Sequence, residues 1–77
     1  EVMADARDQR KLLMQNLEDA GCGAADIARF FQLEREGRRL EQLRLLRMHR
    51  TVLLDRLHAS QRQIDCLDYL IYQMDRG

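Results

Sequence analysis

The sequence predicts an all-α chain in which two short helices precede one long helix. Its 77 residues include no proline and only four glycines, and these are the two residues that helix interiors tolerate least. Gly21, Gly23 and Gly37 separate three stretches that have apolar residues at helical spacing. A chain of this length makes one domain, residues 1–77, with helices expected at about residues 2–20, 24–36 and 38–76.

Each of the first two stretches has the periodicity of a helix with one apolar side. The apolar positions are Met3, Ala6, Leu13, Leu17 and Ala20 in the first stretch, and Ile27, Phe30, Phe31 and Leu33 in the second. Gly21 suits the left-handed residue that closes a helix. Gly37 predicts a bend or a short break before the third helix, with a continuous but kinked helix as the alternative.

The third stretch carries the most informative pattern of the chain, a heptad seam over five heptads. Eight of its ten a and d positions are apolar, and the exceptions are Arg50 at an a position and Ser60 at a d position. The seam consists of Leu43, Leu46, Arg50, Leu53, Leu57, Ser60, Ile64, Leu67, Ile71 and Met74. Such a helix, roughly 58 Å long, must bury its stripe against another helix. Because the rest of the chain is too short to cover it, we expect these residues to form a homodimer interface.

The distribution of charge along this helix favours an antiparallel pair. Residues 38–50 carry five arginines and one glutamate, a net charge of +4, whereas residues 51–77 carry four aspartates and three arginines, a net charge of −1. Antiparallel pairing lays the basic half beside the acidic half of the partner, although exposed pairs contribute only about 0.2–1 kcal/mol each. With the pair centred near Leu57, Arg50 would lie opposite Ile64 of the partner, near its Asp65 or Asp68. The predicted architecture is an antiparallel two-stranded coiled-coil dimer.

Two segments resemble the part of MerR-type transcriptional regulators that follows their winged helix-turn-helix. Residues 17–33 read LEDAGCGAADIARFFQL, and residues 64–72 read IDCLDYLIY. In that family a helix ends at a glycine-hydrophobic turn, and a short helix with an Ile and a Phe or Leu pair follows. After a glycine-containing break, one long helix forms an antiparallel coiled coil between protomers. The resemblance spans roughly residues 10–72 and implies a non-enzymatic effector and dimerisation region.

The chain also departs from the family pattern. The winged helix-turn-helix that reads DNA has no counterpart in this sequence, and Gly23 stands where the family usually places a Ser or Thr N-cap. The resemblance therefore implies the dimerisation half of a regulator, and no DNA-binding residue is carried over to this chain.

No pattern in the sequence indicates a catalytic site, a cofactor or a metal site, and we expect no enzyme. His49 and His58 are nine residues apart and face opposite sides of a helix, so they cannot share one metal ion. Cys22 and Cys66 have no zinc-ligand spacing and are expected to be packing residues. Two cysteines make no disulfide framework, which favours a reducing, cytoplasmic setting.

The predicted partner is a second copy of the chain. Zero net charge and an arginine-rich segment mixed with glutamates do not favour nucleic-acid binding without a helix-turn-helix. No run of 18 apolar residues predicts a membrane span. Two alternatives stay open: a partner-binding regulator that forms heterodimers with full-length regulators, and a metal or thiol sensor that uses Cys22 and Cys66.

Overall fold

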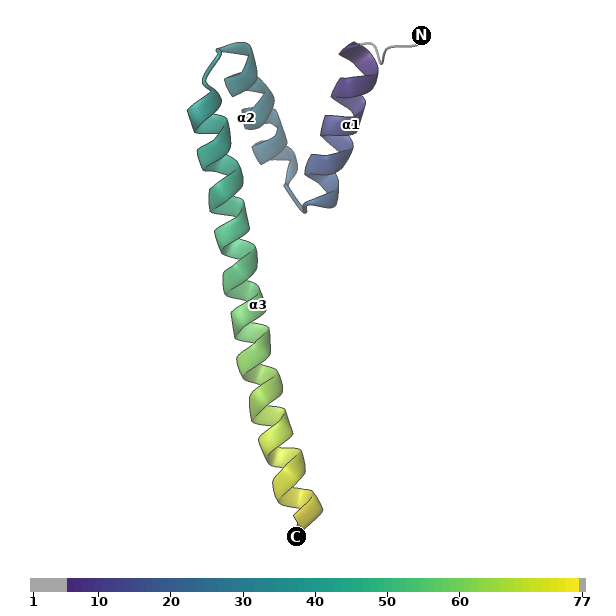
Figure 1. Cartoon of the computed structure of the whole chain (residues 1–77), viewed down its shortest axis with the longest axis vertical. Coiled ribbons are helices and arrows are strands. Elements are labelled where there is room, and N and C mark those ends of the chain that lie inside the picture. The colour runs from purple at the N-terminus through teal and green to yellow at the C-terminus, as the bar shows by residue number, and fades with distance from the viewer. Residues whose placement is uncertain (1–5, 77) are drawn as a thin grey trace. The chain divides into compact units, whose positions relative to one another are not determined.

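A computed structural model describes residues 6–76, and every regular element in that range is a helix (Figure 1). Helix α1 spans Ala6–Asp19, α2 spans Ala24–Arg35 and α3 spans Arg39–Arg76. The predicted order of two short helices and one long helix is confirmed. The expected start of the first helix, with Met3, lies outside the described residues.

The chain divides into two units, and α3 belongs to both. The N-terminal unit, residues 1–46, contains α1, α2 and the first turns of α3. The C-terminal unit, residues 47–77, contains the remainder of α3. Each unit is therefore described by itself below.

The N-terminal unit has a small core made of apolar side chains from α1, α2 and the turn between them. The buried cluster consists of Leu17, Cys22, Phe30 and Phe31, and the half-buried Leu13, Ile27 and Leu46 pack against it. The rings of Phe30 and Phe31 meet edge to face with their centroids 5.6 Å apart, a favoured aromatic geometry. The predicted packing role of Cys22 agrees with its place in this core.

The turn after α1 is a Schellman motif, which satisfies carbonyl groups that the helix end would otherwise leave unpaired. Gly21 has a φ of 81°, and its N–H donates to the carbonyl of Glu18 at 2.9 Å. The N–H of Cys22 donates to the carbonyl of Leu17 at 3.0 Å. Because Leu17 and Cys22 also belong to the core, the turn and the core stabilise each other. The left-handed role predicted for Gly21 is confirmed.

A second turn of the same type separates α2 from α3, so the chain breaks at Gly37 rather than continuing as a kinked helix. Gly37 has a φ of 70°, and its N–H donates to the carbonyl of Glu34 at 3.0 Å. The N–H of Arg38 donates to the carbonyl of the buried Leu33 at 2.9 Å. Since glycine adopts positive φ without a Cβ clash, its position decides where α2 ends.

Polar contacts at the surface join the helices of the N-terminal unit. The Arg10 guanidinium lies 4.3 Å from the centroid of the Phe31 ring and pairs with the Glu34 carboxylate of α2 at 3.3 Å. The side-chain amide of Gln42 donates to the carbonyl of Phe30 at 3.2 Å, which ties α3 to α2. These groups are partly or fully exposed, so each contributes at most about 1 kcal/mol and the apolar core carries most of the stability.

Arg38 links the end of α2 to the start of α3 through its side chain. Its guanidinium bonds the Glu36 carboxylate at 3.2 Å and also the Glu41 carboxylate in the first turn of α3. The hydrogen bond from Arg38, with a second one from Gln32, lowers the pKa of Glu36 below its usual value. The acidic Glu41 also lies where the positive end of the helix dipole favours a negative charge.

Substitutions at two glycines are predicted to change stability in opposite directions. A Cβ at Gly23 or at Gly37 would meet no atom within 4 Å apart from its chain neighbours, so steric clashes do not distinguish the two positions. Gly37→Ala is expected to lower the free energy of unfolding by about 1 kcal/mol, because alanine tolerates positive φ poorly. Gly23→Ser is expected to raise it by about 0.5 kcal/mol, because Gly23 is an N-cap with extended backbone and no side-chain bond. Thermal unfolding followed by circular dichroism measures both, and an unchanged Gly37→Ala variant would contradict the turn geometry.

Candidate dimerisation surface on the long helix

The C-terminal unit presents its apolar side chains to solvent. All of α3 lies within the described residues, and none of its residues is buried. Among its exposed large apolar side chains beyond Arg47, the exposed fraction runs from 40% at Leu53 to 82% at Met74. A lone helix shields its side chains only with its own neighbouring turns, so this unit has no core of its own.

Six apolar seam residues of this unit lie along one side of α3, interrupted by Ser60. They are Leu53, Leu57, Ile64, Leu67, Ile71 and Met74, and every one is exposed. Fully burying a side chain of this kind contributes roughly 1.5–3 kcal/mol before entropy costs. An exposed apolar stripe of this extent is typical of an interaction surface.

The first two seam residues lie in the N-terminal unit and are already half-buried. Leu46 packs against the cluster of Leu17, Cys22, Phe30 and Phe31, and Leu43 is also half-buried. The heptad pattern could not reveal this intramolecular role, because an a or d position looks the same whichever surface covers it. Leu40, one turn earlier, stays 76% exposed, so part of this end of α3 still lacks cover.

The polar seam positions are exposed as well. Arg50 and Ser60 both face solvent within the protomer, as do Arg47 and Asp68 on the edge of the seam. An arginine at an a position costs stability in a dimer unless its guanidinium reaches water or a carboxylate. Its long aliphatic stem can cover apolar surface while the charged head reaches the edge of the interface.

Side-chain contacts along the helix stabilise the C-terminal unit only modestly. The Gln61 side chain donates to the Asp65 carboxylate at 3.1 Å, and the Arg76 guanidinium lies 5.4 Å from the centroid of the Tyr72 ring. Both are i, i+4 pairs, a class that contributes about 0.2–0.5 kcal/mol each. Helices in proteins gain most of their stability from packing of an apolar face against other elements, and the C-terminal unit contains no second element.

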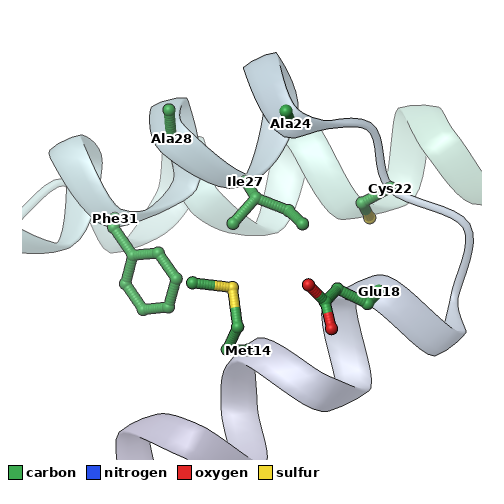
Figure 2. A pocket seen from close by; sticks show the side chains of 7 residues that line it. All are labelled: Met14, Glu18, Cys22, Ala24, Ile27, Ala28 and Phe31. Carbon is green, nitrogen blue, oxygen red and sulfur yellow. The ribbon is translucent and has the colours of Figure 1, made fainter.

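The N-terminal unit carries a separate apolar groove of about 440 Å³ between α1 and α2 (Figure 2). Its lining residues are Met14, Glu18, Cys22, Ala24, Ile27, Ala28 and Phe31. Figure 2 shows Met14 facing Ile27 and Phe31, with the Glu18 carboxylate directed toward the same space. The groove has a volume typical of small-ligand pockets, yet Glu18 is its single charged lining residue. The groove lies beside the core, because Cys22, Ile27 and Phe31 belong to both. Sequence periodicity alone could not predict it.

The histidines and cysteines of the described residues do not assemble into a metal site. No group of three or more His, Cys, Asp or Glu side chains that could hold a metal occurs among residues 6–76. Cys22 is buried in the N-terminal unit, whereas Cys66 is exposed in the C-terminal unit. His49 is half-buried and His58 is exposed. Within the same range, no helix combines the length and the apolar character that crossing a bilayer requires.

Comparisons of the chain with protein-family models, with curated proteins and with solved structures give no match. The similarity to MerR-type regulators therefore stays a prediction drawn from the residues themselves. The exposed seam of α3 and the charges along its edges are the features of the chain that bear on function.

Replacing the central arginine of the seam tests whether it belongs to a buried interface. Arg50→Leu is expected to keep or raise the melting temperature, because a packed apolar residue matches or exceeds a buried ion pair. The same change is expected to loosen the register or admit higher oligomers, because a polar seam position specifies both. Thermal melts and sedimentation of the variant measure these two effects. A large loss of stability in an unchanged dimer would show that the heptad frame is wrong.

Proposed function

We propose that the chain is a non-enzymatic dimerisation module in which two copies pair antiparallel through α3. The observation that carries the proposal is the stripe of exposed apolar seam residues on a unit that has no other element to cover it. At 1.5 Å per residue the 38 residues of α3 extend about 57 Å. Only a partner of similar length covers such a stripe, and a second copy supplies one.

The polar seam residues favour the antiparallel arrangement. In a parallel, in-register pair, each a residue meets the same residue of the partner. Arg50 would then face the partner's Arg50 inside the seam, where like charges are unfavourable. Antiparallel pairing separates the two arginines and brings each toward the half of the partner helix that carries Asp65, Asp68 and Asp75.

The biological setting follows from the resemblance to the dimerisation region of MerR-type regulators. In that setting the chain supplies the contact that joins two protomers. The same seam would also accept the long helix of a related full-length regulator, because a and d side chains set the recognition. The sensor alternative gains no comparable support, since Cys22 packs in the core and is only 8% exposed where it lines the groove.

Two aspartate substitutions at exposed apolar residues separate the seam from the opposite face of α3. Ile64 occupies a seam position and is 49% exposed in the protomer, whereas Tyr69 lies on the outer face and is 63% exposed. Ile64→Asp is expected to give a monomer of 9.1 kDa, because a dimer would bury two uncompensated carboxylates among apolar seam residues. Tyr69→Asp is expected to sediment as the dimer, like the unsubstituted chain.

Sedimentation equilibrium at micromolar concentration decides between the outcomes. A monomeric unsubstituted chain would refute the proposal outright. Equal dissociation of both variants would show that association does not use the heptad face.

A further inference from the structure

We propose that one antiparallel register is selected in which Arg47 and Arg50 of each chain bracket Asp68 of the partner. This inference rests on the proposed homodimer and names the residues that give it orientation and register. All three side chains belong to the C-terminal unit and are exposed in the protomer, so their charges are available to a partner.

The spacing of the seam fixes which positions can meet. From Leu43 forward the steps between seam residues alternate three, four, three, four, and from Met74 backward they follow the same order. Two antiparallel helices therefore stay in phase only when each a position faces a d position of the partner. Pairing a with a would set steps of three against steps of four. A pair centred on Leu57 would set Arg50 against the partner's Ile64, which is an a-to-a pairing. The a-to-d rule sets Arg50 against the partner's Leu67 instead.

The a-to-d register gives five layers, each repeated by the two-fold axis. They are Leu43 with the partner's Met74, Leu46 with the partner's Ile71, Arg50 with the partner's Leu67, Leu53 with the partner's Ile64, and Leu57 with the partner's Ser60. The residue numbers of each layer add up to the same value, which places the two-fold axis between His58 and Ala59. The middle of α3, from Arg39 to Arg76, lies within about one residue of that point. All ten seam positions are used, and each helix extends only about two residues beyond its partner.

The flanking e positions then bring opposite charges together. In an antiparallel pair the e edge of one helix meets the e edge of the other, and a positions lie beside that edge. Arg47 and the partner's Asp68 are both e residues. Along the helix axis the partner's Asp68 falls between Arg47 and Arg50, within about 3 Å of each level. One carboxylate thus faces two guanidiniums, and the two-fold axis repeats the cluster.

Competing arrangements lack this match. In a parallel pair the flanking contacts run from g to e, and they put Arg56 beside the partner's Gln61 and Gln63 beside the partner's Asp68. No opposite charges meet across such flanks. An antiparallel pair shifted by one heptad would place the partner's Asp75 between Arg47 and Arg50. It would leave the surface of Leu43 and Leu46 that the N-terminal core does not cover without a layer. A charge reversal at Asp75 therefore distinguishes the shifted register from the one in which Asp68 faces Arg47 and Arg50.

Two charge-reversed full-length chains that dimerise only with each other would test the register. The first carries Arg47→Glu and Arg50→Glu, and the second carries Asp68→Arg. Each alone puts like charges at both clusters, and its dimer is expected to dissociate about ten- to a hundredfold more readily. Mixed in equal amounts, they restore opposite charges at both clusters. Native mass spectrometry is expected to show the heterodimer as the main species, with a preference that weakens at high salt.

Matched controls separate the register from general charge effects. Arg44→Glu with Arg62→Glu makes the same charge change on the outer face of α3 and is expected to dimerise like the unsubstituted chain. Asp75→Arg in place of Asp68→Arg is expected to give no selective heterodimer. If Asp75→Arg pairs selectively and Asp68→Arg does not, the register is wrong by one heptad. If both reversed chains dimerise normally alone, the charge clusters do not form, whereas an unsubstituted chain that is monomeric would instead refute the proposed function.

Discussion

One physical constraint governs the molecule: the C-terminal unit is a single helix whose apolar seam has no other element of that unit to cover it. Such a stripe exposed to water is unfavourable, and each seam residue that a partner covers contributes roughly 1.5–3 kcal/mol before entropy costs. In the N-terminal unit, apolar side chains pack into a small core within the same chain. The C-terminal unit has no core of its own, so the proposed dimer contact would supply both its stability and its function.

The two units meet within α3, where the helix changes its packing role. Leu46 completes the core of the N-terminal unit, and from Leu53 onward the seam faces solvent. The Schellman turns at Gly21 and Gly37 close α1 and α2 with few connecting residues. These short, hydrogen-bonded turns close the small unit that includes the first turns of α3.

The sequence predicted the helices well, because the signals that define them are local. Glycines at positive φ mark the two turns, and apolar periodicity marks the helical faces. The core role of Leu46 and the groove beside Met14 could not be predicted, since both depend on how α1 and α2 pack in three dimensions. The antiparallel dimer stays a prediction for a related reason: it is a property of two chains, and a heptad pattern alone fixes neither the partner nor its direction.

Hydrogen exchange of the backbone amides tests the proposed dimer at two protein concentrations, one well above and one well below its dissociation constant. If a second copy stabilises the C-terminal unit, amides of residues 47–76 lose protection on dilution, because an unpacked helix opens readily. The protection of amides in α2 changes much less on dilution, because the core of the N-terminal unit lies within one chain. Protection of residues 47–76 that is independent of concentration would contradict the account.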